Sequence, residues 1–215
     1  MNRRIALKNI GLSLGYVVAT PTLIGIMQSC KNTTNVAWTP QFFTKEEGSS
    51  ILHLVDIILP KTDIPSASEV NAHVFIDKFT SEILEKEKQD FIKMTLKLFL
   101  EKSLEKSGKE KIKSLNPEDL EWTLASALKI SKEQREKNEE AIKAYTESVT
   151  NGETATLNSE VACYAFANNL RGMTIWAYKT SEYIAEKVMA YLPVPGEYIG
   201  CESVEKLTKG KAWSL

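Results

Sequence analysis

The sequence predicts an all-α protein: a single helical domain of about six to seven helices, preceded by an N-terminal export signal, with an irregular loop rich in Pro and Gly towards its C-terminus. Three observations support this fold class. Apolar residues recur at spacings of three and four along several segments, which is the period of a helix that buries one face. Residues that start and stop helices stand between these segments. No segment shows sustained alternation of apolar β-branched and polar residues, the pattern of a half-buried strand.

The first two helices are predicted after residue 44. Thr44-Lys45-Glu46-Glu47 has the spacing of a capping box, in which the Thr hydroxyl and the Glu carboxylate each accept a hydrogen bond from a free backbone N–H. Pro60 cannot continue the helix that follows, whose apolar positions are Ile51, Leu52, Val55, Ile58 and Leu59. Ser68 is a good N-cap for a second helix. That helix is predicted to carry Val70, Val74, Phe75 and Phe79 on one side.

The next three helices have clear boundaries. A helix over about residues 87–106 has Gly108 just beyond its end, where a C-cap glycine stands. Its inner stripe is predicted to consist of Phe91, Thr95, Leu98 and Phe99. Asn116-Pro117-Glu118-Asp119 combines an N-cap, a proline at the first helical position and acids at the positive end of the helix dipole. Residues 131–149 are highly charged and predict a helix with a largely solvated face, closed by Asn151-Gly152.

The last third of the chain changes character twice. Residues 161–167 are small and apolar, which predicts close contacts between helices, and a further helix is expected over about residues 180–191. Residues 192–201 then hold two prolines and two glycines, which prevents a helix and predicts a stiff, extended loop with a turn. A loop of this kind, carrying Tyr198, suits docking on another protein, and packing on its own core fits the sequence equally well.

The composition is that of an ordinary globular protein. The chain has 215 residues, 27 Lys+Arg, 28 Asp+Glu, a formal charge of −1 and 43% hydrophobic residues, so it can bury the core of one domain. No polybasic stretch follows residue 8, which argues against a nucleic-acid partner, because such binding depends on clustered Lys and Arg. Three Cys and two His leave little material for metal chemistry.

Residues 1–29 have the layout of an export signal. Several bases and no acid precede residues 10–27, which are moderately apolar and interrupted by glycine, whereas a permanent membrane span needs about 20 strongly apolar residues. The basic segment resembles a twin-arginine motif through Arg3, Arg4, Leu7 and Lys8. Asn2 and Ala6 replace the usual Ser/Thr and Phe of that motif, so the general secretory route stays open.

Met27-Gln28-Ser29-Cys30 resembles a bacterial lipobox, although Gln28 is atypical there. A diacylglycerol on Cys30 would give a periplasmic protein held at a membrane by its lipid, and the alternative is an ordinary buried cysteine. Residues 30–43 are polar without periodicity and predict a tether, which leaves 44–215 as the helical domain. In an oxidising periplasm Cys163 and Cys201 can form a disulfide with each other or with a partner chain, and two free thiols fit equally well.

Two pairs of His and Asp are candidates for chemistry. His53 and Asp56 stand three residues apart on the first predicted helix, and His73 and Asp77 stand four apart on the second, so each pair shares a helix face. A metal site or an acid–base pair made from these four residues would make the protein a stand-alone metal-dependent enzyme. A simple hydrogen bond is the commoner use of such pairs. The sequence contains no dinucleotide or phosphate-binding glycine motif, nucleophile elbow, zinc-protease helix or haem-attachment motif.

Three further segments are distinctive as motifs. They are Leu-Pro-Lys-Thr-Asp-Ile-Pro-Ser-Ala at 59–67 with Val-Phe-Ile-Asp at 74–77, Tyr-Leu-Pro-Val-Pro-Gly-Glu-Tyr-Ile-Gly-Cys at 191–201, and Ala212-Trp213. With the export signal, these segments resemble the gluconate 2-dehydrogenase subunit 3 family. Ser66 stands where this family often has Gly, and the charged middle of the chain resembles the family only loosely.

The resemblance implies a small, non-catalytic subunit that has no cofactor of its own and belongs to an oxidoreductase acting on CH–OH groups. In such complexes a large subunit of the glucose-methanol-choline type binds FAD and oxidises a sugar or sugar acid, and a cytochrome c subunit with haem c often takes the electrons. The large subunit is exported in folded form with the small subunit, whose signal is read by the twin-arginine translocase. A lipoprotein binding module without an enzyme partner is the remaining alternative.

The resemblance also suggests where a partner would bind. The candidates lie in the two loop motifs and near the C-terminus: Pro60, Thr62, Asp63, Pro65, Pro193, Pro195, Gly196, Tyr198, Gly200, Cys201 and Trp213.

Overall fold

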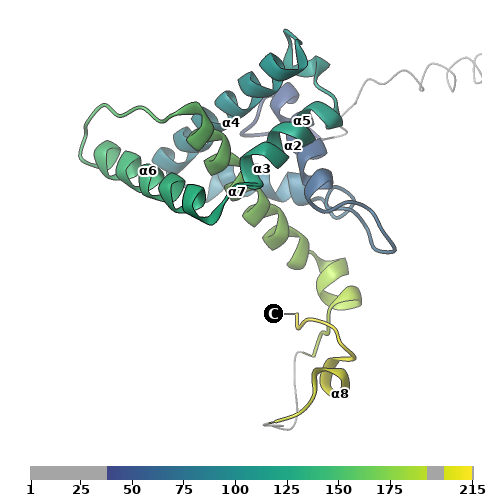
Figure 1. The fold of residues 1–215 in the computed structure, drawn as a ribbon. Helices are drawn as coiled ribbons and strands as arrows, with labels where there is room; N and C mark the ends of the chain where they lie inside the picture. The colour runs from purple at the N-terminus through teal and green to yellow at the C-terminus, as the bar shows by residue number, and fades with distance from the viewer. Residues whose placement is uncertain (1–37, 193–200, 215) are drawn as a thin grey trace, which may run out of the picture. The chain divides into compact units, whose positions relative to one another are not determined.

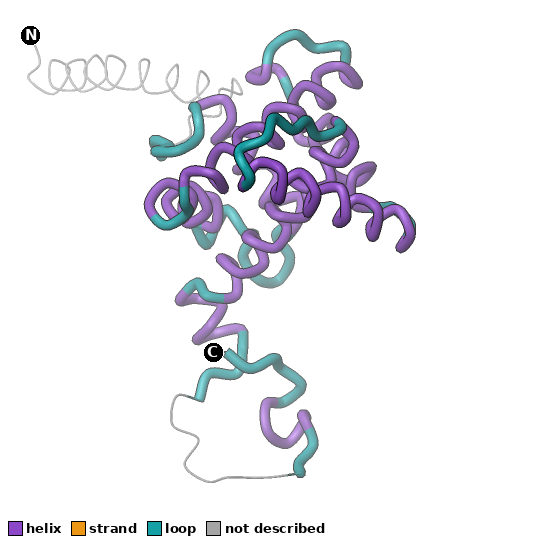
Figure 2. Tube along the Cα trace, turned by 90° about the vertical axis from the view of Figure 1, so that its left-hand side faces the viewer, coloured by secondary structure: helices purple, strands orange, loops and turns teal. Residues whose placement is uncertain are grey.

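The computed structural model describes residues 38–192 and 201–214, and these residues are helical with no strand among them (Figures 1 and 2). The all-α fold class is therefore confirmed. The helices are α2 (Lys45–Ile58), α3 (Ala72–Glu82), α4 (Lys86–Ser107), α5 (Pro117–Leu128), α6 (Lys132–Thr150), α7 (Ser159–Lys179) and α8 (Val204–Thr208). A 3₁₀ turn, η1 (Ile112–Ser114), and a π-helical turn, η2 (Ile184–Val188), complete them.

Several predictions lie outside the described residues. They concern the twin-arginine residues Arg3, Arg4, Leu7 and Lys8, the lipidation site Cys30, and the loop residues Pro193, Pro195, Gly196, Tyr198 and Gly200. None of the helices among the described residues is long and apolar enough to cross a membrane.

The predicted helix caps are present. The Glu47 N–H donates to the Thr44 hydroxyl over 3.2 Å, and the Thr44 N–H donates to the Glu47 carboxylate over 2.8 Å. Asn116 forms a second capping box with Pro117 at the first helical position of α5. Gly108 ends α4 with φ of +67°, a left-handed conformation that glycine adopts without strain. These caps depend on neighbouring residues alone, which is why the sequence locates them.

Helix α7 lies at the centre of the core and contacts each of α2, α3, α4, α5 and α6. Its buried face is rich in alanine, and small side chains let the neighbouring helices approach closely, as the sequence predicts. Larger rings fill the space between α7 and α4, where the Phe166 and Phe99 centroids lie 4.9 Å apart. The side chains in the core that are almost completely buried include Ile51, Leu54, Val55, Ile76, Leu96, Phe99, Leu100 and Leu120.

The predicted start of the second helix is wrong, and the apolar side predicted for it is not the side that is most buried. Asn71, with φ of +61°, precedes the first residue of α3, and Ser68 lies in a turn before it, where Asn71 N–H donates to Ser68 O over 3.0 Å. The face that α3 buries carries Ala72, His73, Ile76, Asp77 and Thr80. Val74, Phe75 and Phe79 are only half-buried. The helix is thus apolar on two sides, and spacing alone could not decide which side faces the core.

Residues 38–43, which we call the lead-in segment, are packed on the helices, so the tether predicted for 30–43 does not extend through them. The Trp38 ring meets the imidazole of His73 edge-on, with centroids 5.0 Å apart. A Cβ on Gly48 of α2 would lie 2.7 Å from Pro40 Cγ, so glycine is required for this close approach.

Asp77 fastens the lead-in segment to α3. Its carboxylate accepts hydrogen bonds from the backbone N–H groups of Gln41, Phe42 and Phe43 over 2.7, 3.0 and 3.1 Å. Asp77 is fully buried, and these three hydrogen bonds replace those that its carboxylate would make with water. The helical domain therefore includes the lead-in segment.

The helix predicted over about 180–191 is shorter than expected. Helix α7 ends at Lys179, and only the π-helical turn Ile184–Val188 follows it. Ala190 then pairs with the end of the chain: its N–H donates to Ala212 O over 2.8 Å, and its carbonyl accepts from Ser214 N over 2.9 Å. This contact between distant residues ends the helical run before Ala190.

Candidate partner-binding surface

The loop between α2 and α3 carries four of the predicted partner-binding residues and has a fixed shape. Pro60 follows Leu59, the C-cap of α2, and the Ala67 N–H donates to Leu59 O over 3.0 Å, which closes the base of the loop. Within the loop, the Thr62 N–H donates to Ile64 O over 3.1 Å. Short bonds of this kind hold Thr62 and its neighbours at the surface in one conformation.

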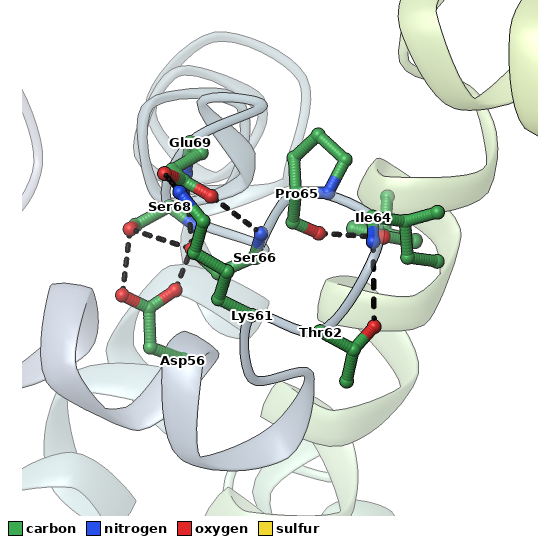
Figure 3. A network of polar contacts seen from close by, with 9 residues as sticks. Asp56, Lys61, Thr62, Ile64, Pro65, Ser66, Ser68 and Glu69 are labelled. Atoms are coloured by element: carbon green, nitrogen blue, oxygen red, sulfur yellow. Dashed lines mark hydrogen bonds and ion pairs between the residues drawn. The ribbon is translucent and has the colours of Figure 1, made fainter.

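Two carboxylates organise the loop from either side (Figure 3). Asp56 of α2 accepts from the backbone N–H and the hydroxyl of Ser68 over 2.8 and 2.6 Å. Glu69 accepts from Ser66 N over 2.9 Å and pairs with Lys61 Nζ over 2.5 Å. The hydrogen bonds from Lys61 and Ser66 lower the pKa of Glu69. Because the Lys61–Glu69 pair is exposed, it positions the loop more than it stabilises the fold.

A third contact ties the loop to the central helix. The Tyr178 hydroxyl of α7 donates to Pro65 O over 2.7 Å, and this bond joins residues 113 positions apart. Burial is the main cause that raises the pKa of Tyr178, so the phenol keeps its proton and remains a donor. The loop is thus held by α2 through Asp56 and by α7 through Tyr178. Sequence analysis missed Tyr178, because no local pattern marks a contact over that separation.

An open groove of about 720 Å³ lies between this loop and the chain that follows α7. Thr62, Asp63 and Pro65 line it, as does the exposed Tyr183 on the opposite side, which the sequence analysis did not select. Charges of both signs border the groove: Lys61, Asp63, Glu69, Glu182 and Lys187. A rigid, mixed polar and apolar surface of this type suits a protein partner.

The remaining candidates that can be placed do not line this groove. Trp213 is exposed and lies beside Ala190 in the pairing at the end of the chain. Cys201 is exposed and free, whereas Cys163 is buried and free, with its Sγ 3.8 Å from Leu98 O. The structure therefore does not join the two cysteines. Burial raises the pKa of Cys163 to about 11, so this thiol is unreactive, and a link between Cys201 and another chain stays a prediction.

The two His/Asp pairs are not assembled into one ligand set. Asp56 is used by Ser68, and Asp77 is used by the lead-in segment. Within 38–192 and 201–214, no group of three or more His, Cys, Asp or Glu is placed to hold a metal ion. The metal site hypothesised for His53, Asp56, His73 and Asp77 is therefore wrong. Burial lowers the pKa of both His53 and His73 against the opposing effect of nearby carboxylates.

His73 has a further distinctive feature. Its ring is 6% exposed, and its Nδ1 has no hydrogen-bond partner. An unpaired polar atom in a buried site costs free energy, and protonation of such a ring costs more.

These features describe a helical protein in which a loop fixed against two helices faces an open groove, an arrangement that suits an accessory or binding subunit. A family model described as gluconate 2-dehydrogenase subunit 3 matches residues 45–196. The chain belongs to this family, and it is accordingly an accessory subunit of a dehydrogenase complex. The matched range contains the loop, the groove and all of α3 to α7. No curated protein and no solved structure matches the chain.

Proposed function

We propose that this protein is the non-catalytic small subunit of a membrane-associated, FAD-dependent gluconate or sugar dehydrogenase. The family match over residues 45–196 is the observation that carries the proposal. In this role the large subunit binds FAD and oxidises the sugar, and a cytochrome c subunit can take the electrons. The present chain escorts the large subunit through twin-arginine export, stabilises it in the periplasm and holds it at the membrane. Arg3 and Arg4 support the export part of the proposal.

Replacement of the arginine pair tests the escort role. The chain with Arg3→Lys and Arg4→Lys is expressed together with the flavoprotein subunit, and dehydrogenase activity is measured in periplasmic and cytoplasmic fractions. We expect the activity to stay in the cytoplasm, because a twin-arginine signal is recognised through both guanidinium groups. The matched control makes the same chemical change at two exposed arginines of the folded domain, Arg135→Lys and Arg171→Lys. Undiminished periplasmic activity in the signal variant would refute the escort role.

The anchor role depends on a separate residue. Cys30→Ser removes the acceptor of the lipid and leaves the rest of the chain unchanged. We expect the periplasmic complex to move from the membrane fraction to the soluble fraction, since a diacylglycerol supplies most of the affinity for the bilayer. Cys201→Ser is the control for loss of an exposed thiol. A complex that stays with the membrane in the Cys30 variant would show that another element anchors it.

A further inference from the structure

Helix α3 carries apolar side chains beside the face that it buries, and Phe75 among them packs on the edge of the core. Phe75 and Phe79 are half-buried there, and Ile83, which follows the helix, is 65% exposed. These residues stand four apart, so they form one stripe along the helix. A surface helix of a protein that acts alone normally carries polar residues on this side.

The stripe continues onto α7, which packs beside α3. The Trp176 indole meets Phe75 and Phe79 edge-on, with centroid distances of 4.9 and 5.0 Å. Trp176 is nevertheless 43% exposed, and the neighbouring Ile175 is 41% exposed. We call Phe75, Phe79, Ile83, Ile175 and Trp176 the α3–α7 patch. Clustered, exposed aromatic and aliphatic side chains of this kind mark sites that another molecule covers.

The patch is rigid before anything binds. Trp176 stands on a helix whose opposite face is buried through Thr174, Ala177 and Tyr178. The two phenylalanine rings stack on each other at 5.7 Å and support the indole from one side. Fixed aromatic side chains lose little conformational entropy on binding, and Trp is the residue type most enriched at energetic centres of interfaces.

The surroundings of the patch indicate the chemistry of what covers it. Exposed Lys78 stands between Phe75 and Phe79 in the sequence of α3, and exposed Lys179 of α7 lines the hollow beside Trp176. No ion pair to either lysine is present among the described residues. Glu82 is the exposed acid on the same stretch of α3. A hollow of about 340 Å³ opens beside Trp176 and is lined by Ile175, Lys179, Ala185 and Met189 among others. The surface therefore suits an apolar side chain entering the hollow, with carboxylates around it.

The flanking charges favour a different protein over a second copy of this chain. In a symmetric contact between two copies the patch would face itself, which would bring Lys78 and Lys179 near the same lysines. Of the two exposed acids at the end of α3, Glu82 and Glu85, Glu85 is already paired with Lys88. The family match makes this chain one subunit of a complex, so a second kind of subunit is available to cover the patch.

We propose that the α3–α7 patch is the surface on which the flavoprotein subunit docks, with an apolar side chain of that subunit in the hollow beside Trp176 and carboxylates facing Lys78 and Lys179. This inference rests on the proposed function and adds the location and chemistry of the contact. The groove beside the loop between α2 and α3 is a separate surface, and Val70 and Asn71, which line it, come just before the first residue of α3.

Co-purification of the two subunits tests the proposal with a matched pair of tryptophans. The tagged full chain is expressed with the flavoprotein subunit, and the flavin absorbance recovered per tagged chain is measured for Trp176→Glu and Trp122→Glu. Trp122 of α5 is 44% exposed and rests against Lys106, so it matches Trp176 in type and exposure. We expect Trp122→Glu to retain the flavoprotein and Trp176→Glu to lose about tenfold or more of it.

A second measurement keeps the test valid if Trp176→Glu folds poorly. A photo-reactive benzoylphenylalanine at Ile175, in an otherwise unchanged chain, is expected to cross-link to the flavoprotein, whereas the same group at Trp122 is not. A cross-link from position 175 to a second copy of this chain, or no cross-link, overturns the docking site. Retention of the flavoprotein by folded Trp176→Glu overturns it as well and leaves the proposed function intact. Absence of any flavoprotein with the unchanged chain overturns the proposed function, and the docking site with it.

Discussion

Removal of the Asp77 carboxylate should detach the lead-in segment from α3. In Asp77→Ala, the backbone N–H groups of Gln41, Phe42 and Phe43 lose the acceptor that they share. A hydrogen bond to a charged group contributes about 1.5–3 kcal/mol, and a buried donor without a partner costs about 1–3 kcal/mol. Phe43 is buried, whereas the other two N–H groups can regain water in part, so we expect a total loss of about 3–5 kcal/mol.

Urea unfolding of the purified protein, followed by circular dichroism and tryptophan fluorescence, measures this loss. A total of that size is a large part of the stability of a domain, which is typically about 5–15 kcal/mol. Asp77→Asn keeps the shape but has only one acceptor oxygen, so we expect a smaller loss of about 1–3 kcal/mol. Limited proteolysis should cut Asp77→Ala within 38–43 faster than the unchanged protein.

Asp63→Ala is the control for loss of a carboxylate. Asp63 is exposed in the loop between α2 and α3, and its removal should change the unfolding free energy by no more than about 0.5 kcal/mol. If Asp77→Ala lies within about 1 kcal/mol of the unchanged protein, the three hydrogen bonds do not hold the lead-in segment, and the reasoning is refuted.

Three further changes have defined outcomes. Burial holds the pKa of His73 below its ordinary value of 6.5, so the unfolded chain binds a proton first as the pH falls through 6.5, and the fold loses stability on the acid side. His73→Phe should therefore flatten the dependence of the unfolding free energy on pH between about 7 and 5, and a slope that stays the same would assign it to other groups. Tyr178→Phe removes the bond to Pro65 O and should cost about 1 kcal/mol in urea unfolding, with faster hydrogen exchange in residues 61–66; unchanged exchange would contradict the loop restraint. Gly48→Ala places a Cβ 2.7 Å from Pro40 Cγ and should lower the thermal midpoint by an amount equivalent to about 1–3 kcal/mol. A higher thermal midpoint would mean that the lead-in segment shifts at little cost in free energy.

The helix boundaries at Thr44, Gly108 and Asn116 could be predicted because each depends on a few adjacent residues. Thr44 and Asn116 cap their helices with side chains three residues further on, and Gly108 ends α4 through its own backbone conformation. The small residues of α7 likewise predicted close packing, because alanines on the buried face of a helix leave room for the neighbouring helices.

The face of α3 could not be predicted, because its orientation depends on distant partners. Asp77 can lie in the core because its carboxylate accepts hydrogen bonds from three backbone N–H groups, which stand 34 to 36 residues earlier in the chain. Without that information, Phe75 and Phe79 look more like core residues than His73 and Asp77 do. The same limit applies to the candidate site: the sequence marked the loop through its prolines, but the bond from Tyr178 that fixes it crosses 113 residues.

The attachment of the lead-in segment has a mechanical consequence. A pull on the chain from upstream of Trp38 would reach the folded part through the lead-in segment, first at the contact of Trp38 with His73 and then at the bonds around Asp77. Three bonds side by side on one carboxylate share such a load, and they transmit it to α3, the helix that also carries Phe75 and Phe79. Tension applied at the N-terminus would therefore be transmitted to α3, the helix that presents Phe75 and Phe79.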